Sequence, residues 1–250
     1  DCHHPDLEEF IEIKSDLNKV TKANISIRIT DDFMVAVKNK VDFELSFTRE
    51  ETGETIKKTV NAYDLFKKIC KMNWDYAEPG MLFWDRIENW NLLSNDPKFH
   101  YAGVNPCAEE PLPAGGSCLL GSLNLSEFVH DKIFDFDDFR KCVRISVNAL
   151  NDVLFEGLPL HPLVEQRRSV NDWRQIGLGI FGLADALIKI EMRYGSNEAV
   201  DFCDKLGRIM AYEAIDASEE LSERVGPYPK YDRNAVLSSS FFIKHTSSLN

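Results

Sequence analysis

A proline-rich stretch near the middle of the chain, residues 105–125, most constrains how these 250 residues can fold. It reads NPCAEEPLPAGGSCLLGSLNL. Pro106, Pro111 and Pro113 each fix φ and lack an amide donor, which excludes a regular helix through the first half. The Pro-Ala-Gly-Gly run that starts at Pro113 indicates a turn, and the apolar run that begins at Cys118 predicts a buried strand. We therefore expect an extended segment, a turn and a strand.

The extended part carries an amide, a thiol and a carboxylate. Alternation along an extended backbone places Asn105, Cys107 and Glu109 on one side. A thiol beside a carboxylate can pass a hydrogen atom while the carboxylate handles the proton. If the chain folds back near Leu112, Cys118 returns to the level of Cys107, where a second thiol can supply reducing equivalents. The plain alternative is a buried cysteine in a tight loop, because free cysteine is among the most buried residue types.

Composition limits the class of protein. A chain of 250 residues is long enough for one sizeable core or two domains, and 44% hydrophobic with 28% charged residues is ordinary for a globular chain. The net charge of −12 argues against a broad nucleic-acid-binding surface but not against a local basic pocket for phosphates. No apolar run approaches the roughly 20 residues of a membrane span, and no signal peptide is visible. We expect a cytoplasmic protein with no membrane or nucleic-acid partner.

The cysteines and histidines do not form a metal or disulfide pattern. Six cysteines are spread widely with no Cys-x-x-Cys pair, which fits a reducing compartment better than a disulfide scaffold or zinc site. His3 and His4 are adjacent, so on a strand they point to opposite faces and cannot easily share one ion. We expect them to be structural, and we expect Cys70 and Cys142 in the core, each on the apolar face of a helix. Trp74 is predicted on the same apolar face as Cys70.

Helical and extended patterns alternate along the chain, which predicts an α/β fold. A hairpin over residues 41–60, with a turn at Glu51-Thr-Gly-Glu, is expected to be peripheral. The periodicity predicts strands at 24–30, 41–47 and 55–60, and helices at 7–14, 61–77, 136–154, 196–225 and from the Asp31-Asp32 cap to Val37.

A glycine-rich run offers a second motif. Gly177, Gly179 and Gly182 match the dinucleotide fingerprint, with Asp201 or Asp204 as a nominal acidic ribose anchor. Those acids fall in a predicted helix, whereas the dinucleotide fold needs the end of a second strand. We prefer glycines that allow close packing between a strand and a helix.

Together these segments resemble the ribonucleotide reductase family. The Asn-Pro-Cys-x-Glu start at 105–109 and the Cys-x-Leu-Gly-Ser-x-Asn-Leu run at 118–125 are similar to its active-site loop. The short spacing between the two cysteines is most similar to the adenosylcobalamin-dependent (class II) branch. Further similar runs are His-Pro-Asp-x-x-x-Phe-Ile-x-x-Lys, Asn-Ile-Ser-Ile, Thr-Asp-x-Phe-Met, Pro-Gly-x-x-Phe-x-Asp-Arg-Ile and Arg-x-Ile-Gly-x-Gly-x-x-Gly-Leu-Ala-Asp.

The resemblance covers essentially the whole chain and implies a fold. It predicts the central part of a ten-stranded α/β barrel, made of two five-stranded halves, with a finger loop that carries Cys107 to their junction. We expect one partial barrel domain over residues 1–250, with no separate second domain. We also expect the chain to be an internal fragment of a longer polypeptide, inactive in isolation.

The resemblance also implies a reaction, the reduction of ribonucleoside di- or triphosphates to deoxyribonucleotides with adenosylcobalamin as cofactor. By that resemblance Cys107 becomes a thiyl radical and takes the 3′ hydrogen, while Glu109 accepts the 3′-hydroxyl proton. Asn105 hydrogen-bonds the substrate and holds the loop. Cys118, with a second cysteine outside this chain, donates two electrons as the 2′-hydroxyl leaves as water. No cobalamin-binding motif is visible.

Partners follow from the same resemblance. Residues 15–23 match the loop that links a deoxynucleotide effector to substrate choice, which makes Ser15, Lys19 and Lys22 candidate contacts. The alternative is a solvated surface loop with incidental lysines. A thioredoxin-like or dithiol reductant and a homodimer are also implied.

Other classes remain open. One is the large subunit of a class I reductase, whose radical arrives from a second protein. Another is a non-catalytic nucleotide-binding module that has kept the effector loop. A thiol hydrolase is disfavoured because no histidine lies near Cys107 in sequence to act as base, and a zinc site is weaker still.

Overall fold

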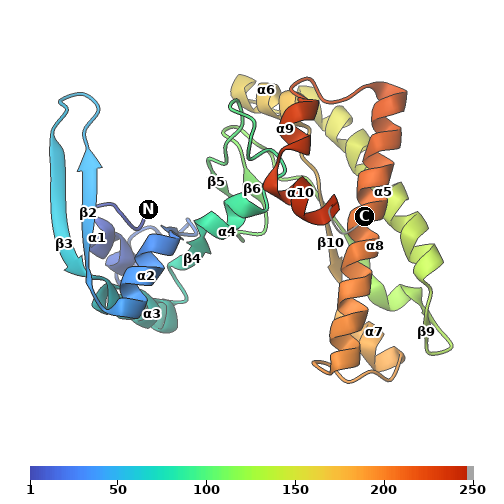
Figure 1. Ribbon diagram of the computed structural model, residues 1–250, viewed down its shortest axis with the longest axis horizontal. Coiled ribbons are helices and arrows are strands. Elements are labelled where there is room, and N and C mark those ends of the chain that lie inside the picture. Colours follow the sequence, from blue (N-terminus) through green and yellow to red (C-terminus); the bar gives the residue numbers. More distant parts are fainter. Residues whose placement is uncertain (247–250) are drawn as a thin grey trace. The chain divides into compact units, whose positions relative to one another are not determined.

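The computed structural model describes residues 1–246, which divide into two compact units (Figure 1). The first unit comprises residues 1–100, 104–111 and the end of the chain from Arg233, and the second comprises 101–103 and 112–232. Each unit has its own buried core of apolar side chains. The predicted α/β character is confirmed, since both units combine helices with strands.

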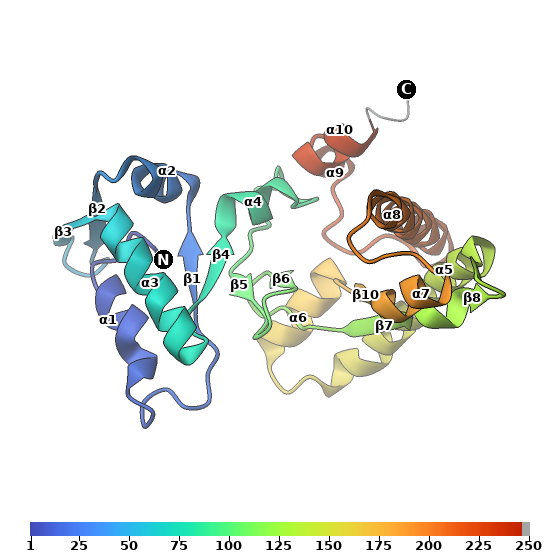
Figure 2. The same ribbon diagram turned by 90° about the horizontal axis from the view of Figure 1, so that it is seen from below.

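Two parallel strands lie at the centre of the first unit, β1 (Ser26–Ile29) and β4 (Gly80–Phe83). They lie side by side with Ser26 opposite Gly80 (Figure 2). Ile27 and Ile29 are fully buried and Arg28 between them is exposed, as the alternating sequence predicts. Gly80 permits the close approach, because a Cβ there would lie 2.8 Å from Oγ of Ser26.

Helices pack on these strands and build the first core. They are α1 (Leu7–Glu12), which runs into a 3-10 turn at Ile13–Ser15, then α2 (Asp31–Asn39), α3 (Ala62–Tyr76) and α4 (Trp84–Asn89). The most deeply buried side chains of this core are Cys2, Leu7, Ile11, Ile27, Ile29, Phe33, Leu45 and Ile69.

Two peripheral features complete the first unit. Strands β2 (Asp42–Thr48) and β3 (Thr55–Asn61) pair antiparallel, with Thr48 opposite Thr55, over the range predicted for a hairpin. Helices α9 (Arg233–Leu237) and α10 (Ser240–Thr246) contact the segment after α4. There the rings of Trp90 and Phe241 lie 6.0 Å apart.

The prediction that Cys70 is a core residue is wrong. Helix α3 buries Ala62, Leu65, Ile69 and Met72, which recur at intervals of three and four residues. Cys70 follows Ile69 by one residue, about 100° further round the helix, and is exposed. Trp74, assigned to the same apolar face, is 88% exposed. Cys142 does pack against the second core, as predicted, and is half-buried.

Two long helices organise the second unit, α5 (Phe136–Gly157) and α8 (Asn197–Val225), which pack along each other (Figure 1). Asp135 caps α5 by accepting from the amides of Asp137 and Asp138. The other elements here are α6 (Val164–Trp173), α7 (Leu183–Lys189) and the short antiparallel pair β8 (Val129–His130) and β9 (Ile133–Phe134).

The second unit contains a parallel strand pair of its own. Strand β7 (Leu120–Asn124) lies beside β10 (Gly177–Phe181), with Leu120 opposite Gly177 (Figure 2). The predicted strand therefore begins two residues after Cys118. It is not buried either, because Leu120 is 48% exposed.

The described strands form five two-stranded sheets, and residues 1–246 do not close into a barrel. The ten-stranded barrel and the single barrel domain therefore stay predictions. Among the described helices, none combines the length and apolar character needed to cross a membrane.

The glycine-rich run serves close packing, but Gly179 provides it between two strands, and only Gly182 provides the predicted packing between a strand and a helix. A Cβ on Gly179 would lie 3.2 Å from Oγ of Ser122 on the neighbouring strand. Gly182, in the left-handed region at φ +70°, precedes α7, and a Cβ there would collide with Oδ1 of Asn124. That oxygen cannot move freely because it accepts from the amide of Ser126. Asp201 and Asp204 lie inside α8 and not at the end of a strand.

Gly182→Ala is predicted to destabilise the protein by about 2–4 kcal/mol, the sum of left-handed backbone strain and overpacking. Gly195→Ala is the matched control, because Gly195 has φ +78° with nothing within 4 Å of its Cβ position. We expect this control to cost only about 1 kcal/mol. Urea unfolding of both variants measures the difference, and equal losses would show that the contact with Asn124 contributes nothing.

Candidate active site

Residues 105–110 form the tip of a hairpin between β5 (Gly103–Val104) and β6 (Pro111–Leu112). The amide of Ala108 donates to the carbonyl of Asn105 at 3.0 Å, which closes a β-turn with Pro106 and Cys107 at its two central positions. The expectation of an extended segment at 105–109 is therefore wrong. The fixed φ of proline suits the second position of a β-turn, and this local preference prevails over strand-like alternation.

Asn105 holds this turn together. Its backbone amide donates to the carbonyl of Glu110 at 3.2 Å, and its side-chain Oδ1 accepts from the amide of Glu110 at 3.0 Å. These contacts agree with the predicted loop-holding part of its role, while its contact with substrate stays a prediction. Ala108 adopts φ +68°, so the chain leaves the turn through a left-handed residue. Glu109 follows it and is exposed.

Cys107 is exposed at a cleft of about 400 Å³ within the first unit. The walls come from the starts of β1 and β4 and from the turn, and include Asn24, Ser26, Glu78, Met81 and Pro106. A volume of this size falls in the range of small-molecule sites. The alternative of a buried cysteine in a tight loop is excluded for Cys107, because this residue is exposed.

Cys118 belongs to the second unit and is exposed. The predicted turn before it is present: the amide of Gly116 donates to the carbonyl of Pro113 at 2.9 Å, and Gly115 has φ +70°. A Cβ on Gly115 would lie 3.0 Å from the carbonyl oxygen of Glu165, so this turn packs closely on α6. The return of Cys118 to the level of Cys107 stays a prediction.

The loop proposed for effector contact begins where the first helix ends. Ser15 Oγ donates to the carbonyl of Glu12 at 2.7 Å, which makes Ser15 a helix-end residue. Lys19 and Lys22 are exposed, and Nζ of Lys19 lies 3.8 Å from a carboxylate oxygen of Asp16. Their contact with an effector stays a prediction.

Lys14 is the residue of this region that the sequence analysis missed. Its Nζ donates to the carbonyls of Val20 and Ala23, both at 2.6 Å, and lies 2.8 Å from a carboxylate oxygen of Glu78. Its side chain is only 14% exposed. The available signal was a lysine on the apolar stripe of the first helix, where a charged group needs a partner.

Glu78, just before β4, is the ion-pair partner of Lys14, and we call this pair the Lys14–Glu78 anchor. One carboxylate oxygen pairs with Lys14 and the other accepts from the amide of Ile25 at 3.0 Å. The hydrogen bond from Lys14, assisted by the Ile25 amide, lowers the pKa of Glu78 against the opposing effect of burial. The carboxylate is therefore charged at neutral pH and holds both groups.

A second missed residue, Asn24, connects β1 to the active-site turn. Its Nδ2 donates to the carbonyl of Pro106 at 3.1 Å. The two residues are 82 positions apart in the sequence, so no local sequence pattern predicts the contact.

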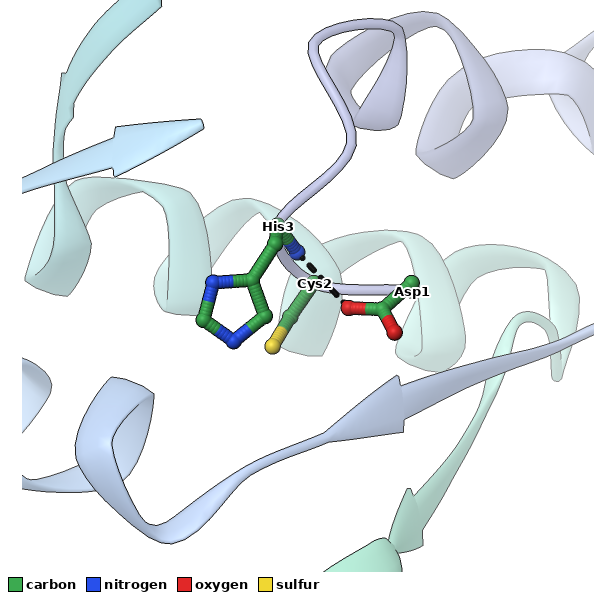
Figure 3. A group of neighbouring side chains, drawn as sticks. All are labelled: Asp1, Cys2 and His3. Carbon is green, nitrogen blue, oxygen red and sulfur yellow. Dashed lines mark hydrogen bonds between the residues drawn. The ribbon is translucent and has the colours of Figure 1, made fainter. Parts of the chain in front are cut away.

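Asp1, Cys2 and His3 form a group whose potential metal-ligand atoms lie within 4.8 Å of one another (Figure 3). Sγ of Cys2 and Nε2 of His3 lie 3.3 and 3.1 Å from Oγ1 of Thr30, so both are already hydrogen-bonded. Burial raises the pKa of the Cys2 thiol, which favours the protonated form over the metal-binding thiolate. We interpret this group as a hydrogen-bonded part of the first core.

His3 and His4 each pack against a ring of the β2–β3 hairpin in a tilted orientation. The centroid of His3 lies 5.0 Å from that of Phe43, and the centroid of His4 lies 4.8 Å from that of Phe47. These contacts agree with the structural role predicted for the two histidines.

Comparison with known proteins places the chain in a family. The family model of the ribonucleotide reductase barrel domain matches residues 1–248. The chain belongs to the ribonucleotide reductase family.

Three relatives illustrate the similarity. A vitamin B12-dependent ribonucleoside-diphosphate reductase of Thermoplasma acidophilum is 36% identical over 92% of this chain. A protein of the same name from Mycobacterium tuberculosis is 32% identical over 92%. A ribonucleoside-diphosphate reductase large chain of Encephalitozoon cuniculi is 29% identical over 96%. The matched part spans only 29%, 32% and 34% of these relatives, respectively.

The lowered pKa of Glu78 predicts an acid-sensitive anchor. A carboxylate with a depressed pKa stabilises the folded protein fully above its ordinary pKa of about 4.3, and this contribution is lost as pH falls through the lower folded-state value. Glu78→Gln removes it. We expect the stability difference between wild type and Glu78→Gln, measured by urea unfolding, to be constant from pH 7 to 5 and to shrink below.

The matched control is Glu51→Gln, in the exposed turn of the β2–β3 hairpin, which makes the same substitution away from Lys14. A wild-type advantage over Glu78→Gln that stays unchanged down to pH 3 would contradict the assignment of the anchor to the charged carboxylate.

Proposed function

We propose that the protein containing this chain reduces ribonucleotides to deoxyribonucleotides by a thiyl-radical mechanism centred on Cys107. One observation carries the proposal: Cys107 is exposed at the tip of a hydrogen-bonded turn beside a cleft of about 400 Å³. A thiol that must exchange a hydrogen atom with a bound substrate needs both access and a defined position. The family membership and the names of the relatives support the same reaction.

Each residue of the turn has a role in this proposal. Cys107, as a thiyl radical, takes the 3′ hydrogen of the substrate. Glu109 accepts the 3′-hydroxyl proton as the 2′-hydroxyl leaves as water. Cys118 and a cysteine outside this chain supply two electrons and two protons and end as a disulfide. Glu109 then returns its proton to the 3′ oxygen, and Cys107 returns the hydrogen to C3′, so that the thiyl radical is regenerated. Asn105 holds the turn through the amide of Glu110 and hydrogen-bonds the substrate.

We infer that the radical derives from adenosylcobalamin, as the names of the archaeal and mycobacterial relatives suggest for those proteins. When bound, this cofactor supplies a carbon-centred radical. The exposed thiol of Cys107 suits the acceptor side of that chemistry. We therefore assign to this chain the thiol that receives the radical.

The fold and assembly of the whole protein extend this proposal. The parallel pairs β1–β4 and β7–β10, each packed by helices, are consistent with four strands of a ten-stranded α/β barrel. The tip at 105–110 is then the finger loop of that barrel. We propose a homodimer that uses a thioredoxin-like or dithiol reductant and binds a deoxynucleotide effector at Ser15, Lys19 and Lys22. Because further cysteines and strands are needed, the isolated chain is expected to be inactive.

A class I large subunit is the second candidate. It is favoured by the similarity to the large chain of Encephalitozoon cuniculi, at 29% identity. In that case the radical comes from a partner protein, and the roles of Cys107, Glu109 and Asn105 are unchanged.

Cys107→Ser is predicted to abolish reduction, with a loss of about a thousandfold or more, as for other essential catalytic groups. The assay uses the intact polypeptide with a ribonucleoside di- or triphosphate, dithiothreitol and adenosylcobalamin, and it is repeated without the cobalamin. Cys70→Ser is the matched control, since Cys70 is also exposed but does not line the cleft. Deoxyribonucleotide formed by wild type and the control only with cobalamin, and not by Cys107→Ser, is the expected result.

Two other outcomes are informative. Product that forms only after a radical-generating partner subunit is added would assign the protein to class I. Effector binding without product under either condition, unaffected by Cys107→Ala, would identify a non-catalytic nucleotide-binding module.

Glu109→Gln tests the proposed base separately. Removing a general base typically costs about 10²- to 10⁴-fold in rate. We therefore expect kcat to fall by that factor while KM changes little. Glu50→Gln, also an exposed glutamate, is the control and should retain full kcat. A Glu109→Gln variant with wild-type kcat would remove Glu109 from the mechanism.

A further inference from the structure

The cleft beside Cys107 contains a hydroxyl group that has no partner within residues 1–246. Ser26 lines this cleft at the start of β1, and its Oγ makes no hydrogen bond to a described residue. Alternation along the strand explains its direction, because Ile27 and Ile29 are buried in the core and Ser26 therefore points to the opposite face. The hydroxyl of this half-buried residue is thus a polar group that the wall of the cleft offers to a ligand.

Gly80 keeps this hydroxyl accessible. It lies opposite Ser26 in the β1–β4 pair, and a Cβ there would lie 2.8 Å from Oγ of Ser26. The φ of Gly80 is outside the left-handed region, so its backbone conformation does not require glycine. A glycine inside a strand often marks a position at which another backbone or a ligand approaches closely. A side chain at position 80 would cover the hydroxyl, and glycine leaves it open.

The charges around the cleft are already compensated. Among the described residues that line it, Glu78 is the only one with a charged side chain, and Lys14 pairs with it at 2.8 Å. Arg28, two residues beyond Ser26 on β1, does not line the cleft, and its guanidinium packs over the ring of Trp84 at 4.3 Å. A phosphate group is bound most strongly by charge-assisted hydrogen bonds from cations. This cleft therefore does not suit the phosphate end of a nucleotide.

The remaining walls of the cleft suit a flat, uncharged group. Met81 and Leu82 contribute apolar side chains. Beside the hydroxyl of Ser26, which can donate and accept, lies the side-chain amide of Asn24. Nδ2 of Asn24 donates to the carbonyl of Pro106, and its Oδ1 accepts from no described residue. A nucleobase presents hydrogen-bond donors next to acceptors along its edge, so that one base can satisfy both side chains.

We propose that Ser26 hydrogen-bonds the nucleobase of the substrate, in a cleft that takes the nucleoside end of a ribonucleotide and leaves the phosphates outside. This inference rests on the proposed function for the class of ligand, but its test does not require turnover. Ser26 lies two residues, roughly 6–7 Å along β1, from Asn24, which bonds to the turn of Cys107. The ribose therefore lies on the side of the thiol, and the base lies on the side of Ser26.

The test measures how ligands protect Cys107 of the intact polypeptide from alkylation by iodoacetamide, with mass spectrometry of the peptide that contains it. The probes are the four ribonucleosides, their diphosphates and inorganic pyrophosphate. We expect at least one nucleoside and its diphosphate to protect the thiol, and pyrophosphate to leave it unprotected. In Ser26→Ala the concentration for half-protection should rise about fivefold, the effect of one lost hydrogen bond. The factor should be the same for the nucleoside and its diphosphate, because Ser26 contacts only the part that they share.

Ser46→Ala is the matched control, because Ser46 is also a half-buried serine on a strand of the first unit but does not line the cleft. Its half-protection concentration should change by less than about twofold. Gly80→Ala is a second variant, in which the added methyl group covers the hydroxyl of Ser26. It should weaken protection by the same nucleoside at least as much as Ser26→Ala, and urea unfolding checks that it is folded.

Three results overturn the inference: unchanged half-protection in Ser26→Ala, protection by pyrophosphate alone, or no protection by any nucleoside or diphosphate. A protein that forms deoxyribonucleotides but shows no effect of Ser26→Ala on protection would retain the reductase proposal and refute this one. Protection that depends on Ser26, in a protein that forms no deoxyribonucleotide, would refute the reductase proposal and retain the nucleoside site.

Discussion

The ion pair between Lys14 and Glu78 is the contact on which the arrangement of the first unit depends most. Both side chains are largely withdrawn from water, at 14% and 23% exposed, and together they satisfy the carbonyls of Val20 and Ala23 and the amide of Ile25. Removing either partner would leave a charge without its counterpart in a poorly solvated place, which is far more costly than losing a surface pair. The pair therefore sets where the loop ends and where β1 begins.

From this anchor the cleft follows in two steps. The amide of Gly80 donates to the carbonyl of Ile25 at 2.9 Å, which brings the start of β4 next to the start of β1. Gly80 has no side chain to collide with Ser26, so the two strands can approach closely. Their first residues then form the walls beside the turn, and Asn24 bonds to the turn itself. A charged pair that touches no proposed catalytic residue thus determines the surroundings of the thiol.

Local patterns in the sequence predicted the elements but not these connections. Features that depend on neighbours within a few residues could be predicted from the sequence. They are the alternation around Ile27 and Ile29, the long apolar stripes of α5 and α8, and the Pro113–Gly116 turn. The failures were of two kinds. Cys70 was predicted to lie in the core and Trp74 on the same apolar face, because a broad apolar run does not specify which 100° of a helix is buried. The turn at Cys107 was taken as extended, although proline permits both conformations, and its contact with Asn24 lies beyond any local signal.

The position of the Cys107 thiol and the source of the proposed radical depend on different parts of the protein. The exposed position of Cys107 is set by backbone contacts, the Ala108 amide to Asn105 and the Pro106 carbonyl to Asn24, and not by any group that would bind a cofactor. A turn held in this way presents the same sulfur to a radical from a cofactor or from a second protein. In the proposed reaction, the chemistry at the substrate needs only that sulfur, a carboxylate such as Glu109 and a pair of reducing thiols. Under the proposed function, the radical source can therefore differ while the turn that presents Cys107 stays the same.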